Sequence, residues 1–89
     1  MVVKKGARVW IPCQVKEGPF PDERVVRVHS ALGDSLAFVR TNFLKDPILA
    51  GDTFVCAIVV DVRGDKFIAE LPGQEIGSKE FEGETSRVS

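Results

Sequence analysis

The sequence has few of the residues that build catalytic or metal-binding sites. Its 89 residues include one histidine, two cysteines, one tryptophan and no tyrosine. No CxxC or HxxxH spacing is present, so we expect no metal site and no cofactor. His29 belongs to no nucleophile motif, and the acidic residues are spread along predicted turns rather than placed for acid–base chemistry. The sequence therefore predicts a protein that is not an enzyme.

Charge and hydropathy argue against a strongly basic nucleic-acid-binding protein and against a membrane protein. The net charge is −1, so there is no overall basic field to attract nucleic acid. No apolar run approaches the roughly 20 residues of a membrane span, and Met1–Gly6 lacks the apolar core of a signal peptide. We therefore expect an intracellular protein with no membrane contact. Cys13 and Cys56 are then predicted to be buried thiols rather than a disulfide.

The strongest local pattern lies between Gly51 and Leu71. Two apolar runs, Thr53–Val62 and Lys66–Leu71, flank the turn-forming sequence Arg63-Gly64-Asp65. Because glycine and aspartate tolerate the backbone angles of tight turns, this pattern predicts a β-hairpin.

The first run of this hairpin is apolar on both faces until Asp61. We expect its inner face to carry the set Phe54, Cys56, Ile58, Val60 and Val62. The other face then needs a cover from this chain or from a partner, and its residues are Val55, Ala57 and Val59. In the second run, the alternation places inward the residues Phe67, Ala69 and Leu71.

The first strand is predicted over Ala7–Val15, where apolar residues alternate with polar ones. Trp10 and Pro12 fall on the polar face. Pro12 has no N–H for a ladder hydrogen bond, so at least this part of the strand lies at an edge of its sheet. Trp10 is either a contact residue or is covered by the C-terminal tail.

Two more strands are predicted before the hairpin, over Glu23–His29 and Ser35–Thr41. An amphipathic helix over Ala31–Leu44 is an alternative, because apolar residues there also recur at helical spacing. A Gly-Asp pair precedes an apolar run at residues 33, 51 and 64. The third pair lies in the predicted hairpin, so by analogy the first pair favours a strand over Ser35–Thr41.

Five strands with short connections predict an all-β fold, a small five-stranded barrel of the OB/S1-like or SH3-like kind. We expect one barrel domain over residues 1–76, with N-terminal strands in 1–45 and the hairpin in 51–76. Residues 77–89 are predicted to form a polar C-terminal tail, since four glutamates and few large apolar residues lie beyond residue 74.

From Gly51 onward the sequence resembles an S1 domain, an OB-fold module that binds RNA. The resemblance is carried by Gly51-Asp52, Ile58-Val59, Gly64-Asp65, Phe67-Ile68 and Leu71-Pro72-Gly73. Residues 81–87, FEGETSR, are similar to the segment that follows these strands in cap subunits of the RNA exosome. This resemblance covers mainly residues 51–87. It implies an RNA-processing assembly with protein subunits as partners, in the nucleus or the cytoplasm.

A second resemblance covers residues 7–12, ARVWIP, which look like the opening of the SH3-like subdomain of unconventional myosin heads. That resemblance implies a protein-interaction module instead. The two hypotheses differ in their surface: one basic face favours RNA, and a neutral apolar patch around Trp10 favours a protein.

The two hypotheses also name different residues. A module that binds single-stranded RNA by charge and stacking would use Arg40, Arg63, Lys66 and Phe67. A module that binds a protein would use Trp10, Pro12, Val55 and Val59.

Overall fold

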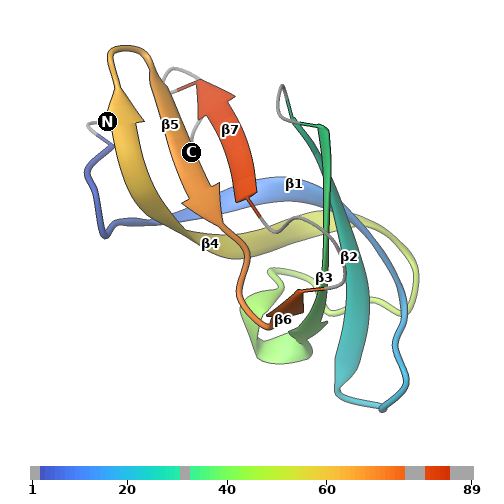
Figure 1. Cartoon of the computed structure of the whole chain (residues 1–89). Helices are drawn as coiled ribbons and strands as arrows, with labels where there is room; N and C mark the ends of the chain where they lie inside the picture. The colour runs from blue at the N-terminus through green and yellow to red at the C-terminus, as the bar shows by residue number, and fades with distance from the viewer. Residues whose placement is uncertain (1–2, 31–32, 76–79, 85–89) are drawn as a thin grey trace.

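The computed structural model describes residues 3–30, 33–75 and 80–84, which contain seven strands of one antiparallel sheet. The strands are β1 (Arg8–Glu17), β2 (Glu23–Ser30), β3 (Gly33–Arg40), β4 (Gly51–Arg63), β5 (Lys66–Glu70), β6 (Gln74–Glu75) and β7 (Glu80–Glu84). They pair in the order β6-β3-β2-β1-β4-β5-β7, and a short 3₁₀ turn, Thr41–Phe43, follows β3. The sheet curls into a half-barrel, which brings β7 close to β2 and β3 (Figure 1).

The prediction of a small, barrel-like all-β fold is confirmed, and the five predicted strands correspond to β1–β5. Two further strands were not predicted. β6 pairs with β3, and β7 pairs with β5 inside the segment that we expected to be a polar tail. The helical alternative for residues 31–44 is wrong where the structure describes it, because Gly33–Arg40 is β3; residues 31–32 lie outside the described ranges.

The core lies on one face of the curled sheet, where every second side chain of the long strands is buried. Its members are Val9, Ile11, Cys13, Val15, Val26, Val28, Ala37, Val39, Leu44, Val55, Ala57, Val59, Phe67, Ala69 and Leu71, with Val3 at one end. The inward faces predicted for the first strand and for the second strand of the hairpin are confirmed.

The buried face of β4 is the opposite of the one that the sequence predicts. Val55, Ala57 and Val59 are 0%, 0% and 1% exposed, whereas Phe54 is 38% and Ile58 is 46% exposed. Pairing with β1 explains the choice, because this register sets Val55 and Ala57 opposite residues of β1 that are also buried. The cover that this face requires is therefore supplied by the chain itself.

A β-bulge near the end of β4 changes the alternation. The ladder between β4 and β5 skips Val60, which shifts the later residues of β4 by one position. Val62 therefore lies opposite the buried Phe67 and packs against the core. Of the five residues predicted to be the inner face of this strand, Val62 alone packs against the core, because it lies beyond the bulge.

The predicted turn of the hairpin is confirmed. Arg63 pairs with Lys66, so Gly64 and Asp65 form a two-residue loop. Gly64 has a φ of 62°, and no non-glycine residue of the described chain has a positive φ. A positive φ at the first loop residue alone is typical of a type II′ turn, which matches the twist of the flanking strands.

One charged side chain, Arg24, lies in the interior at 6% exposure. Its guanidinium donates from Nε to the carbonyl of Ile48 over 2.8 Å. It also donates from Nη1 to the carbonyls of Pro21 and Glu23, over 2.9 Å each. These bonds satisfy the buried charge and hold the loop between β1 and β2 against the loop between β3 and β4.

The orientation of β4 predicts opposite outcomes for two neighbouring substitutions. Ala57→Asp buries a carboxylate without a partner and should lower the free energy of unfolding by more than about 3 kcal/mol. Ile58→Asp replaces an exposed side chain and should cost less than about 1 kcal/mol. Urea denaturation of both variants measures the difference. Equal losses would contradict the observed orientation.

Removal of the Arg24 guanidinium should be costly, because three carbonyl groups lose a charged donor. We expect Arg24→Met to lower the free energy of unfolding by about 3 kcal/mol. Arg27→Met, on the exposed face of the same strand, is the matched control and should cost less than about 1 kcal/mol. Thermal unfolding followed by circular dichroism compares the two, and a similar melting temperature for both would refute a clamping role of Arg24.

Candidate functional site

The outer face of β1 and β4 carries a group of apolar side chains that the core does not use. We call it the outer cluster; it consists of Trp10, Pro12, Phe54, Cys56 and Ile58. The ladder sets Trp10 opposite Cys56 and Pro12 opposite Phe54, so the members are cross-strand neighbours on one face. Pro12, Phe54 and Ile58 are exposed, and Trp10 and Cys56 are half-buried. Directly paired residues of this kind lie about 5 Å apart, so the cluster is continuous.

Charged side chains surround the outer cluster. The Nζ atom of Lys45 lies 5.5 Å from the centre of the Phe54 ring, within the range of a cation–π contact. Ile58 lies between Arg8 on β1 and Glu70 on β5 in the ladder. The cluster is therefore an apolar centre with a rim of both charge signs.

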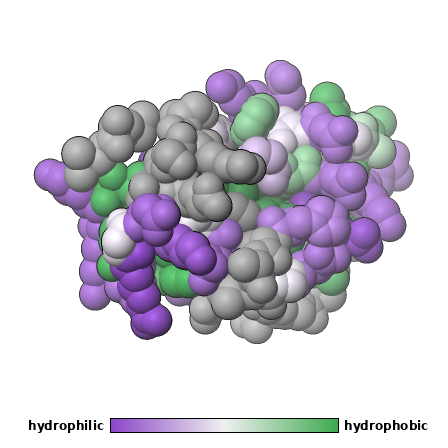
Figure 2. All heavy atoms as spheres, turned by 90° about the horizontal axis from the view of Figure 1, so that it is seen from above, coloured by the Kyte–Doolittle hydropathy of each residue, from purple (hydrophilic) through white to green (hydrophobic). Residues whose placement is uncertain are grey.

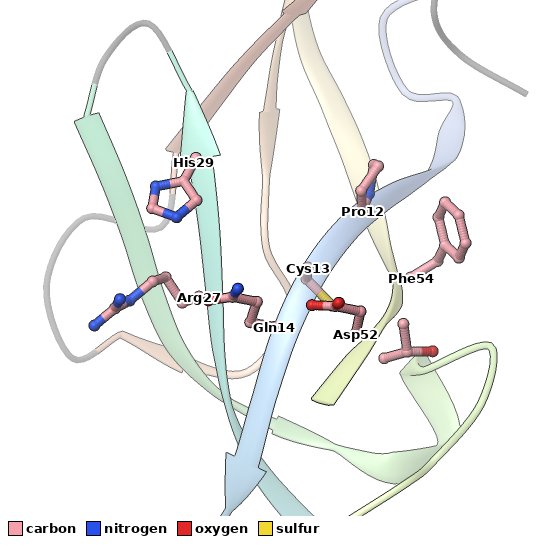
Figure 3. A pocket seen from close by; sticks show the side chains of 8 residues that line it. Pro12, Cys13, Gln14, Arg27, His29, Asp52 and Phe54 are labelled. Atoms are coloured by element: carbon pink, nitrogen blue, oxygen red, sulfur yellow. The ribbon is translucent and has the colours of Figure 1, made fainter. Parts of the chain in front are cut away.

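A groove of about 350 Å³ adjoins the outer cluster where β2 separates from β1 (Figure 3). Its lining residues come from three strands: Pro12, Cys13, Gln14, Arg27, His29, Asp52, Thr53 and Phe54. Pro12 and Phe54 belong to both the groove and the outer cluster, so the two features form one surface.

The groove wall formed by β2 carries two nitrogen-containing side chains that share one carboxylate. The Nδ1 atom of His29 lies 2.5 Å from one carboxylate oxygen of Asp34, and the Nε atom of Arg27 lies 3.9 Å from the other. All three side chains are partly exposed. Figure 3 shows Arg27 and His29 on one side of the groove and Asp52 and Phe54 on the other.

The residues predicted to bind RNA are not brought together. Arg40 ends β3 beside the 3₁₀ turn, whereas Arg63 and Lys66 flank the turn between β4 and β5 at the opposite end of the view in Figure 1. Arg63 also donates from Nε to Asp61 over 2.9 Å, and this bond lowers the pKa of Asp61. Phe67 is 1% exposed, so it cannot stack on a base.

The residues predicted to contact a protein separate into two pairs. Trp10 and Pro12 lie in the outer cluster. Val55 and Val59 are buried in the core and cannot contact a partner, because the side chains of β4 face the other way from the predicted orientation. The residues that sequence reasoning missed are Phe54 and Ile58. Their large side chains on a strand apolar on both faces were the available signal, but alternation alone did not say which face is outward.

A second group of exposed apolar side chains lies away from the outer cluster. Phe20 is 63% exposed, Leu49 is 58% exposed and Ile48 is 37% exposed, and all three lie in the loops that Arg24 connects. Seen from above, the described residues present mostly hydrophilic side chains, with smaller apolar areas between them (Figure 2).

The cysteines occupy opposite faces of the sheet, and both are free. Cys13 is buried, as predicted, and burial, with a smaller effect of the Asp52 charge, raises its pKa to about 12. Cys56 is half-buried in the outer cluster, which corrects the prediction that both thiols are buried.

Within the described residues, no group of three or more histidine, cysteine, aspartate or glutamate side chains is placed to hold a metal ion. No helix in the described chain is long and apolar enough to cross a membrane.

No protein-family model matches the chain, and comparison with curated proteins and with solved structures finds no match. The resemblance to S1 domains therefore stays a prediction.

The two thiols should differ in reactivity. At pH 8 the Cys13 thiol stays protonated and buried, whereas Cys56 reaches the outer surface. We expect iodoacetamide to alkylate Cys56 at least about tenfold faster than Cys13, because the reactive species is the accessible thiolate. Mass spectrometry of tryptic peptides measures both rates. Faster alkylation of Cys13 in the folded protein would contradict its burial.

Proposed function

We propose that this protein is a non-catalytic interaction module that binds a partner protein through the outer cluster. The observation that carries the proposal is the exposed apolar centre at Phe54 and Ile58, at 38% and 46%, beside Trp10 and Pro12. A strand of a sandwich or barrel commonly exposes polar residues on its outer face, whereas β4 presents large apolar side chains there.

The composition of the outer cluster supports this proposal. Tryptophan is enriched among the residues that contribute most to protein binding, and such residues sit at the centre of an interface with a polar rim. Here Trp10 is central, and Arg8, Lys45 and Glu70 supply the rim. A stable interface buries about 800 Å² on each partner, so the cluster would be the centre of a larger contact.

Binding of single-stranded RNA by the predicted residues is less well supported. A binding face of that kind needs basic side chains that converge beside exposed aromatic rings. Arg40 lies far along the chain and the sheet from Arg63 and Lys66, and Phe67 is in the core. Arg63 is already paired with Asp61.

A binding experiment with the full chain tests the proposed function. The chain carries an affinity tag, captures partners from an extract, and one captured protein is then purified for titration. We expect Ile58→Asp to weaken its binding at least about tenfold, because a charge replaces an exposed apolar side chain of the contact. Trp10→Ala should have a similar effect. Trp10 is the sole tryptophan, so its fluorescence should also change when the partner covers it.

Leu49→Asp is the matched control, because it introduces the same charge at an exposed apolar residue outside the outer cluster. It should leave binding unchanged. Equal losses for Leu49→Asp and Ile58→Asp, or no loss for either, would refute the outer cluster as the contact surface. A parallel titration with a single-stranded RNA oligonucleotide at two salt concentrations addresses the competing function; tight binding that weakens steeply with salt would favour RNA.

A further inference from the structure

The pairing between β1 and β2 stops partway along both strands. The last pair joins Gln14 and Arg27, although β1 extends back to Arg8 and β2 continues to Ser30. Over the remaining positions, and within the described residues, β1 pairs with β4 alone and β2 pairs with β3 alone. The two strands diverge there, and the groove lies at the point of divergence (Figure 3).

Pro12 accounts for the end of this ladder. Just beyond the other end of the ladder, the N–H of Gly18 donates to the carbonyl of Glu23 over 3.2 Å. Because the residues of an antiparallel strand direct their backbone N–H and C=O groups alternately to either side, the even-numbered residues of β1 direct theirs toward β2. Toward the N-terminus from Gln14, the next even-numbered residue is Pro12. If the register continued, Pro12 would lie opposite His29. Proline has no N–H to donate, so the ladder cannot continue there. The prediction of an edge at Pro12 is confirmed for this part of β1.

The same alternation leaves backbone groups of β1 directed toward the gap. The N–H of Val59 donates to the carbonyl of Ala7 over 2.8 Å, which assigns the odd-numbered positions of β1 to β4. The carbonyl of Pro12 and both backbone groups of Trp10 therefore point to the other side, where no described strand is paired with them. A row of such groups is the template that an extended peptide uses when it adds a strand to a sheet.

The side chains around the gap match a peptide with two kinds of residue. Pro12 and Phe54 offer an apolar surface on one side. On the other side Arg27, His29 and Asp34 form a polar wall whose side chains are partly exposed and can exchange hydrogen bonds with a bound segment. A peptide strand that places an apolar side chain on the first wall and a polar one on the second is complementary to both.

A nucleic acid fits this groove less well than a peptide. Asp34 and Asp52 place two carboxylates at or beside it, and Asp52 has no ion pair within the described residues. Phosphates would be repelled by both. An extended peptide carries its charges singly and can supply main-chain donors and acceptors as well.

We propose that an extended segment of the partner protein, with apolar and polar side chains in alternation, pairs with the free edge of β1 and lies in this groove. The proposal rests on the proposed function, since the outer cluster and the groove share Pro12 and Phe54. The outer cluster then supplies the apolar contact, and the edge of β1 fixes the direction and register of the bound segment.

The probe is a displayed library of random linear peptides, selected on the immobilised full chain. We expect the enriched peptides to alternate polar residues with β-branched or aromatic ones, as a strand in this groove requires. Binding of a synthetic enriched peptide should shift the amide resonances of Trp10 and His29. Methylating alternate backbone nitrogens of that peptide removes the donors to β1 and should weaken binding at least about tenfold.

Pro12→Val provides the variant test. Valine keeps an apolar side chain in the outer cluster but restores the N–H, so β2 can continue along β1 and occupy the edge that the peptide needs. We expect affinity for the peptide to fall at least about tenfold while the melting temperature is retained or raised. Pro19→Val, in the exposed loop between β1 and β2, is the matched control and should bind the peptide as well as the original chain.

The outcomes separate this proposal from the proposed function. Strand pairing is overturned, and the outer cluster stands, if the affinity for the peptide is unchanged by N-methylation of the peptide and by Pro12→Val but is lost in Ile58→Asp. If no peptide is enriched, the proposal for the groove fails. The proposed function is then tested by the titration with the captured partner protein alone. A concentration-dependent dimer that Pro12→Val dissociates would show a second copy of the chain at this edge, which also overturns the peptide proposal.

Discussion

The pairing of β1 with β4 is the contact on which the rest of the structure depends. It runs from Arg8–Ile58 to Val15–Gly51 without interruption. On one face it sets Val9 against Ala57 and Ile11 against Val55, which form the middle of the core. On the other face it sets Trp10 and Pro12 against residues of β4. One ladder therefore builds both the core and the outer cluster, because the side chains of a strand alternate between faces.

Both faces of β4 carry apolar side chains, and the curl of the sheet buries one of them. Small and branched side chains, Val55, Ala57 and Val59, face the concave interior, where the other strands cover them. The larger Phe54 and Ile58 stay outside. Since a curled sheet has less room on its inner face, placing the small residues there lets the strands approach closely. The exposed remainder is the surface from which we infer protein binding.

Pro12 links this packing to the groove. A residue with a free N–H at this position would let β2 continue along β1, and the sheet would present no gap there. Proline is tolerated because β4 needs no N–H from an even-numbered position of β1. The same residue is thus compatible with the core, contributes to the outer cluster and leaves one backbone edge unpaired.

Much of the architecture could be predicted from the sequence. The strands β1–β5, the turn at Gly64, the inward faces of β1 and β5 and the edge at Pro12 all follow from local patterns that tertiary contacts do not override. The strand β7 could not be read in this way. Three of its five residues are glutamates, and it forms because the edge of β5 offers backbone partners. The separation of Arg40 from Arg63 likewise depends on strand order.

The amino-acid sequence by itself determined that the chain forms a small β structure, because branched residues and turn-forming pairs act over a few neighbours. It also placed Trp10 and Pro12 on an outer face. Only the tertiary structure decided which face of β4 is buried, since both faces are apolar and the register with β1 makes the choice. That choice placed Val55 and Val59 out of reach of any partner and brought Phe54 and Ile58 to the surface.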